Sequence, residues 1–266
     1  MRKKGIVYSR VLENDKDSLN EIKKAGFDCL MFGWYKRDKI TALSDMAKSI
    51  GLFPEIIHAP FLNIVGKANI NSMWLEGEEG EAVLEELRET VSVAGDNGIP
   101  YVVVHLSSGN NAPCVNDIGA DRFDRLIEHA CSQNVTLAFE NQRKLANIAF
   151  IMEKYIDCKY VGFCWDNGHE ACFTNGREYM PLFGDKLVCT HIHDNFAQEE
   201  GDDHLIPFDG RLDFNRYAEH IKKSGYTGTL LLETVMSCGN YSDMTAEQFL
   251  SKAYSAVCKI DEMCEL

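Results

Sequence analysis

The stretch Val188-Cys189-Thr190-His191-Ile192-His193-Asp194-Asn195 decides how the rest of the sequence is interpreted. Its apolar beginning and polar end predict a buried strand whose carboxyl end carries metal-ligand side chains. His191 and His193 are two positions apart, so they point to the same side of a strand. For this stretch alone, two histidines hydrogen-bonded in the core are the plainer interpretation. We reject it because similar polar ends follow several other strand-like segments.

Short apolar runs alternate with amphipathic, charged stretches along the chain, which predicts repeated βα units around a parallel sheet. We expect strands at residues 6–9, 27–33, 52–61, 101–105, 135–139, 161–165, 187–192 and 228–232. We expect helices at 17–24, 41–50, 80–96, 121–132, 145–155, 214–223 and 246–260. The connection at 170–186 has little helical periodicity.

Eight strands in 266 residues, with no linker or composition shift, predict an α/β fold: a single (β/α)₈ TIM barrel spanning residues 1–266 as one domain. A doubly wound open sheet has the same local pattern and is the alternative. Its polar site residues would cluster near one switch point. Here they follow strands in both halves of the chain, which favours the barrel.

Composition disfavours several classes of function. Forty-one acidic against 27 basic residues give a net charge of −14, which disfavours nucleic acid and anionic membranes as partners. The ten cysteines are scattered without a CxxC pair, so we expect reduced thiols. No apolar segment is long enough for a signal peptide or a membrane span, which predicts a cytoplasmic protein. Apolar residues on the outer helices are compatible with a homo-oligomer.

Metal-ligand residue types gather at the expected strand ends and in the loops that follow them. In a closed barrel these ends meet at one mouth, so the residues can surround one or more metal ions. Only two of the eight histidines, His129 and His220, fall in expected helices, where we expect solvated positions. The strand-end set is His58, His105, Glu140, Asp166, His169, His191, Asp202, His204 and Glu233.

Glu140 and Glu233 each follow an apolar run, so each carboxylate lies at the edge of an apolar interior. Such a group must be paired, protonated or bound to a cation. An ion pair is one alternative, and Arg143 is close enough in sequence to Glu140 to form it. The functional interpretation is that both glutamates bind one metal and act as general acid and base from two sides of a substrate.

Other signals are weak when taken singly. Asp166 and His169 flank Asn167-Gly168, which is turn chemistry by itself, and we expect both on a turn. A solvated acidic loop is the alternative interpretation for Asp202 and His204. His58 and His105 fit core histidines.

Taken together, these motifs resemble the xylose isomerase-like barrel superfamily, which joins sugar isomerases and epimerases to endonuclease IV. The whole chain takes part in the resemblance. The motifs are specific for the superfamily and poor at choosing a member within it. They are His58-Ala59-Pro60-Phe61, Val104-His105, Phe139-Glu140-Asn141, Asp166-Asn167-Gly168-His169, His191-Ile192-His193-Asp194-Asn195, Asp202-Asp203-His204 and Leu232-Glu233.

The ketose 3-epimerase and hydroxypyruvate isomerase branch implies one Mn²⁺ or Mg²⁺ held by Glu140, Asp166, His191 and Glu233. His169 would then contact the substrate. The oxygen-rich set suits a hard ion. The reaction implied is isomerisation or epimerisation of a small sugar, or its phosphate, through an enediolate with the paired glutamates as acid and base. Arg211 is a weak candidate for a substrate oxygen or phosphate.

The endonuclease IV branch implies up to three Zn²⁺ ions and cleavage at abasic sites in DNA. All of its ligand types have a counterpart in the strand-end set, with His58, His105, His169, Asp202 and His204 as additional ligands. Against it stand the charge of −14 and the lack of a basic, aromatic loop that would grip a duplex. A barrel that only binds a sugar or a metal is the non-enzymatic alternative.

Overall fold

The strands lie close to the expected segments. The computed structural model describes residues 1–174, 176–237 and 241–265. The strands are β1 (Lys4–Val7), β2 (Cys29–Gly33), β3 (Phe53–His58), β4 (Tyr101–His105), β5 (Thr136–Glu140), β6 (Val161–Asp166), β7 (Leu187–His191) and β8 (Leu230–Leu232).

The strands form a parallel sheet in the order β7-β6-β5-β4-β3-β2-β1-β8. Strand β8 pairs with β1 over three residues, from Lys4 opposite Leu230 to Ile6 opposite Leu232. Between β7 and β8 the sheet is joined by a parallel bridge of Ile192 with Leu232. The sheet therefore closes into a (β/α)₈ TIM barrel, and the open-sheet alternative is excluded.

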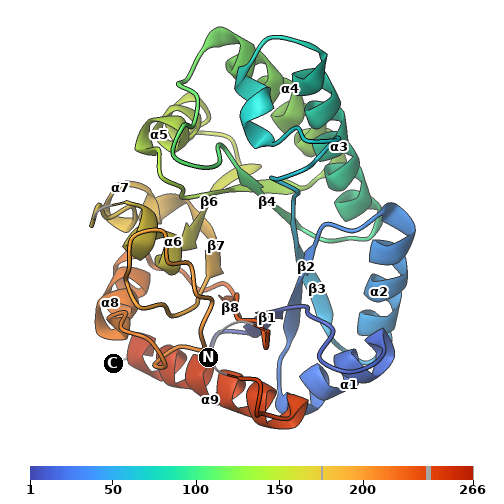
Figure 1. Cartoon of the computed structure of the whole chain (residues 1–266), viewed down its shortest axis with the longest axis vertical. Coiled ribbons are helices and arrows are strands. Elements are labelled where there is room, and N and C mark those ends of the chain that lie inside the picture. Colours follow the sequence, from blue (N-terminus) through green and yellow to red (C-terminus); the bar gives the residue numbers. More distant parts are fainter. Residues whose placement is uncertain (175, 238–240, 266) are drawn as a thin grey trace.

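The helices surround the barrel in chain order, and α9 lies beside α1, where the first and last units meet (Figure 1). Amphipathic patterns and end signals define them: Asn14 and Asp213 cap the starts of α1 and α8, and Gly26 and Gly225 end these helices with positive φ. The helices are α1 (Asp15–Ala25), α2 (Arg37–Ser49), α3 (Glu78–Asp96), α4 (Asp117–Gln133), α5 (Leu145–Lys154), α6 (Asn167–Phe173), α7 (Met180–Phe183), α8 (Phe214–Ser224) and α9 (Ala246–Glu265), with 3-10 turns η1 (Ile70–Trp74) and η2 (Gly184–Lys186).

The apolar core has two parts, because successive residues of a strand face opposite sides of the sheet. On β4, Val102 and Val104 pack in the large cluster shared with the helices, whereas Val103 belongs to a small cluster inside the barrel. The other buried members of this inner cluster come from six further strands. They are Met31, Ile56, Ala138, Cys164, Cys189 and Leu231.

One local expectation is wrong, and the weakly patterned segment 170–186 contains short helices. Residues 166–169 do not form a turn, because Asp166 ends β6 and caps α6, with its side chain accepting a hydrogen bond from the His169 N–H. The segment 170–186, which has little helical periodicity, contains most of α6, all of α7 and η2. Short helices bury too few residues to leave a periodic pattern.

The structure also answers two questions about the state of the cysteines and about membrane-spanning helices. The cysteines that the structure describes are free thiols, as expected, while Cys238 lies outside the described residues. Within residues 1–174, 176–237 and 241–265, no helix has both the length and the apolar character needed to cross a membrane.

Candidate metal centre and active site

Strand geometry brings the site residues to one place. Each of six inner-cluster residues is followed two positions later by a site residue, so both face the barrel interior. The inner cluster forms the floor, and the polar residues lie one layer nearer the carboxyl ends of the strands, where TIM-barrel active sites are found. The pairs are Ile56 with His58, Val103 with His105, Ala138 with Glu140, Cys164 with Asp166, Cys189 with His191, and Leu231 with Glu233.

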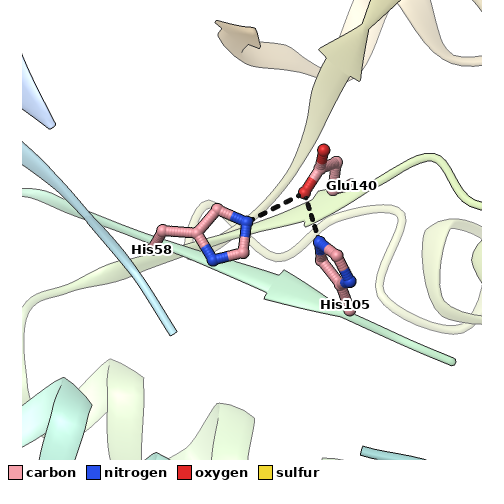
Figure 2. Close-up of side chains that lie close together, drawn as sticks. All are labelled: His58, His105 and Glu140. Carbon is pink, nitrogen blue, oxygen red and sulfur yellow. Dashed lines mark hydrogen bonds and ion pairs between the residues drawn. The ribbon is translucent and has the colours of Figure 1, made fainter. Parts of the chain in front are cut away.

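Glu140 is at the centre of the site and is fully buried. One of its carboxylate oxygens, Oε2, lies 2.7 Å from His105 Nε2 and 3.3 Å from His58 Nε2, so two imidazoles from neighbouring strands converge on one atom (Figure 2). The other oxygen, Oε1, lies 3.0 Å from His169 Nδ1 and 3.3 Å from His191 Nδ1. The ion pair with Arg143 is absent from the described contacts, because Arg143 pairs with Glu200 instead.

The four residues that the epimerase resemblance implies as metal ligands form one group. Glu140, Asp166, His191 and Glu233 each offer a ligand atom, and these atoms all lie within 4.8 Å of one another. His191 Nδ1 is 3.1 Å from Glu233 Oε2. Asp166 Oδ2 and Glu233 Oε2 are buried, and neither accepts a hydrogen bond of good geometry among the described residues, although His191 Nδ1 lies close to Glu233 Oε2. Converging buried carboxylates with unpartnered oxygens are costly without a cation, so these residues fit a divalent metal ion.

A second group comes from the loop after β7 and from α6. Asp202 Oδ2 lies 3.3 Å from His169 Nε2 and 3.2 Å from His204 Nε2, and Asp202 Oδ1 lies 3.4 Å from His193 Nε2. The rings of His193 and His204 stack with centroids 4.4 Å apart. The acidic loop is therefore folded into the site, and the solvated-loop alternative for Asp202 and His204 is wrong.

Charge complementarity governs protonation in both groups. Burial disfavours the ionised form of Glu140, but the nearby imidazoles of His105, His169 and His191 outweigh burial and hold the pKa of this carboxyl well below its usual value. Burial likewise opposes the charge on His204. Its contacts with Asp202 and Glu233 outweigh burial and raise the pKa of His204 to about 10.

Asparagine side chains fix the ends of the strands that carry these groups. Asn141 donates to the Asp166 carbonyl at 2.8 Å and accepts from the Asp166 N–H at 2.8 Å, which ties the end of β5 to the end of β6. Asn167 makes the same pair of bonds with the backbone of His193, at 2.9 and 3.1 Å. The site therefore has a rigid backbone frame, which metal and catalytic geometry require.

A cavity of about 310 Å³ opens beside Glu233 at the mouth of the barrel. Trp34 and Phe61 contribute aromatic walls, and His58 and Glu233 are its titratable lining residues. The Trp34 indole N–H donates to Glu86 at 2.8 Å, and the Phe61 ring stacks on His105 with centroids 4.2 Å apart, so both rings are held in place. The cavity can hold a small molecule next to the candidate metal centre.

Several sequence expectations are changed by the structure. The Arg211 side chain is exposed, and among the described hydrogen bonds and ion pairs none joins it to the site. His129 and His220 are partly buried rather than solvated: His129 Nε2 lies 2.8 Å from Ser92 Oγ, and His220 packs edge-on against Trp165.

One residue next to the centre was missed. Gln142 is buried, with its amide nitrogen 3.0 Å from His169 Nδ1 and 3.3 Å from His105 Nε2. Gln142 follows Glu140 by two residues in the sequence, and this spacing could have identified it as a site residue.

Comparisons with known proteins agree with the fold. The sequence pattern of the xylose isomerase-like TIM barrel family matches residues 19–250. Over 223 residues the chain is 28% identical to the uncharacterized protein y4fM of Sinorhizobium fredii, covering 79% of this chain and 70% of that protein. It is 23% identical to the uncharacterized protein MJ1311 of Methanocaldococcus jannaschii, covering 67% of this chain and 63% of that protein.

Solved structures share the fold at low sequence identity. A D-tagatose 3-epimerase-like protein superposes with a TM-score of 0.74 at 20% identity, covering 99% of this chain and 98% of that one. The D-psicose 3-epimerase of Clostridium cellulolyticum H10, solved with D-tagatose, superposes with a TM-score of 0.74 at 15% identity, covering 99% of this chain and 100% of that one. An L-ribulose 3-epimerase superposes with a TM-score of 0.72 at 17% identity, covering 100% of this chain and 95% of that one.

Proposed function

Because the chain belongs to the xylose isomerase-like TIM barrel family, we propose that it is a divalent-metal-dependent isomerase or epimerase of a small sugar, sugar phosphate or sugar derivative. The support is one arrangement: ligand atoms of Glu140, Asp166, His191 and Glu233 lie within 4.8 Å of one another. Glu233 also lines the 310 Å³ cavity. A metal-binding carboxylate therefore faces the space in which a substrate fits.

Three carboxylates and one imidazole favour a hard ion, Mn²⁺ or Mg²⁺. When bound, the ion supplies Lewis-acid stabilisation of the negative charge that develops on substrate oxygens during proton removal. His191 and Asp166 are the ligands without a proposed part in proton transfer. Their role is to hold the centre in place.

Glu140 and Glu233 are the proposed acid and base. One carboxylate removes a proton from the carbon next to the substrate carbonyl, and the other returns a proton. Return to the opposite face of the same carbon gives epimerisation, and return to the adjacent carbon gives exchange between aldose and ketose. His58, which lines the cavity, and His169, which lies beside Glu140, are the residues proposed to contact substrate hydroxyl groups.

Solvent-proton exchange tests this proposal directly. The Mn²⁺-loaded protein is incubated in D₂O with ketopentoses and ketohexoses, free and phosphorylated, and deuterium at the carbon next to the carbonyl is followed by NMR. We expect exchange with at least one sugar, and a fall of about 100- to 10,000-fold in Glu140→Gln and Glu233→Gln. His129→Gln, in α4 and outside the barrel interior, is the control. Bound metal is measured for each variant, so loss of the ion is separated from loss of the acid or base.

Unchanged turnover in both glutamate variants would contradict acid and base catalysis by this pair. Absence of turnover with every sugar, together with retained metal and sugar binding, would favour the non-catalytic binding barrel.

A metal-dependent endonuclease acting at abasic sites is the second candidate function. It is favoured by two further groups beside the four-residue centre, namely His58 with His105 on Glu140, and His169 with His204 on Asp202. The net charge of −14 opposes DNA binding. About one Mn²⁺ or Mg²⁺ per chain supports the isomerase, whereas about three Zn²⁺ and cleavage of a duplex with one abasic site support the nuclease.

A further inference from the structure

His193 lies behind the candidate metal centre and contacts two carboxylates that belong to different parts of the chain. Its ring is fully buried, and Nε2 lies 3.3 Å from Asp166 Oδ1 and 3.4 Å from Asp202 Oδ1. Among the described residues this Nε2 has no hydrogen bond of good geometry, so its contact with the two carboxylates is electrostatic. Asp166 belongs to the end of β6, whereas Asp202 belongs to the loop after β7.

The ring has little freedom to move. The backbone of His193 is held by two hydrogen bonds with the Asn167 side chain, one donated and one accepted by that amide, and one face of the ring stacks on His204. Its Nδ1 lies 3.4 Å from the Asp194 carbonyl oxygen. A buried side chain fixed on several sides transmits its position to the groups that it contacts.

The loop of residues 196–204 depends on such contacts for its conformation. Ala197, Glu200 and His204 have φ values of 55°, 62° and 47°, which non-glycine residues rarely adopt. Backbone in this region persists only where surrounding contacts hold it. The contacts here include an ion pair of Glu200 with Arg143, the contacts of Asp202 with three imidazoles, and a contact of 2.7 Å between His204 Nδ1 and the Glu233 carbonyl oxygen.

We infer that His193 is a positioning residue that couples the metal ligand Asp166 to the 196–204 loop through Asp202. This inference rests on the proposed function only in taking Asp166 as a metal ligand. Through this contact, an ion that orders Asp166 also stabilises the loop conformation described above. By thermodynamic reciprocity, stabilising this loop conformation strengthens metal binding.

Metal affinity is the first test. Mn²⁺ is titrated calorimetrically into the metal-free full chain and into His193→Ala, His193→Gln and the control His129→Gln. We expect the Mn²⁺ dissociation constant to rise about 10- to 100-fold in His193→Ala, a typical cost of removing a group that orients a ligand. His193→Gln, which restores a polar edge, should recover part of this loss. Affinity equal to wild type in both His193 variants would overturn the inference.

Hydrogen exchange is the second test, and it separates positioning from general stability. In the wild-type chain we expect Mn²⁺ to slow amide exchange in residues 196–204. In His193→Gln this protection should shrink, while exchange of the amides in β4 and β5 stays as in wild type. If Mn²⁺ protects the loop equally in wild type and His193→Gln, the coupling does not pass through His193. The comparison of wild type with His193→Gln tests the coupling even if His193→Ala fails to fold.

A double-mutant cycle completes the argument. If His193 acts through Asp202, then Asp202→Asn should weaken Mn²⁺ binding, and His193→Gln added to it should cost less than it costs in the wild-type chain. Additive losses would contradict the proposed route. None of these measurements uses a sugar. Failure to find sugar turnover would therefore count against the proposed function and leave the inference on His193 standing.

Discussion

Gly168 lies so close to His193 that a Cβ atom at position 168 would be 1.9 Å from His193 Cε1. Gly168 is the second residue of α6 and its φ is not positive, so backbone freedom does not explain the glycine. The imidazole of His193 occupies the space that any side chain at position 168 would need.

Gly168→Ala should therefore destabilise the fold despite the better helix propensity of alanine. We expect the free energy of unfolding to fall by about 1 to 3 kcal/mol, the usual cost of overpacking, with weaker Mn²⁺ binding because His193 is displaced. Urea denaturation and calorimetry measure the two effects. Gly33→Ala is the matched control, since a Cβ there meets nothing within 4 Å. Equal stability of Gly168→Ala and wild type would show that His193 can move without cost.

Metal removal should lower stability as well as activity. Three carboxylates share the centre, and two of their oxygens are buried without hydrogen bonds of good geometry among the described residues. At a free Mn²⁺ concentration 100 times its dissociation constant, we expect the free energy of unfolding to rise by about 2.7 kcal/mol. Thermal unfolding of the chelated protein and of the Mn²⁺-loaded protein measures this gain. The gain should be smaller in Glu233→Gln, and an unchanged melting temperature on chelation would contradict a metal at this centre.

The cavity wall should affect substrate binding separately from metal binding. Trp34 lines the 310 Å³ cavity and is held by its bond to Glu86, away from the four-residue centre. Trp34→Ala should raise the KM of an accepted sugar about tenfold, equivalent to about 1.4 kcal/mol of binding, with an unchanged Mn²⁺ dissociation constant. Steady-state kinetics and calorimetry give the two values. A normal KM would place the substrate elsewhere.

A pH-dependent contribution to stability lies at the opposite end of the barrel. Asp261 of α9 is buried and pairs with Lys4 and with Arg2, whose Nη1 is 3.0 Å from Asp261 Oδ1. Burial raises the pKa of Asp261, but Lys4 and Arg2 outweigh burial and lower it below its usual value. The stabilisation is therefore complete above the unfolded-state pKa of about 3.9 and is lost as pH falls through the lower folded-state pKa.

Asp261→Asn tests this sign. At pH 7 we expect a loss of about 3 to 5 kcal/mol, because the substitution leaves Lys4 buried without its partner. The difference from wild type should shrink as the pH falls below about 4. Glu85→Gln, which removes an exposed pair with Arg88, should cost less than about 1 kcal/mol. If the difference in the free energy of unfolding between wild type and Asp261→Asn grows as the pH falls, the pKa of Asp261 is not lowered in the folded protein.

The sequence predicted the barrel and the convergence of its strand ends because both follow from periodicity. In β5, Leu137 and Phe139 pack toward the helices and Ala138 faces the barrel interior, so Glu140, two residues after Ala138, faces the interior as well. Tertiary contacts were not predictable in this way. Asn167-Gly168 has turn chemistry, but the Asp166 side chain caps a helix at this point, and the capping bond prevails.

The loop residues show the same limit. Asp202 lies eight residues beyond Asp194, in a stretch with no periodic pattern, so its contacts with His169, His193 and His204 depend on a loop path that one sequence does not encode locally. Asp194 fixes part of that path by accepting backbone N–H bonds from Phe208 and Gly210.

Strands β7 and β8 are joined by less backbone pairing than other neighbouring strands of the barrel, such as β4 and β5. Ile192 links the two strands by a bridge to Leu232, whereas β4 and β5 pair over five residues. His191 and Glu233, 3.1 Å apart, face each other across this weak joint. An ion held by both residues would link β7 to β8 across this joint. In the metal-free protein, opening of the barrel should therefore begin there.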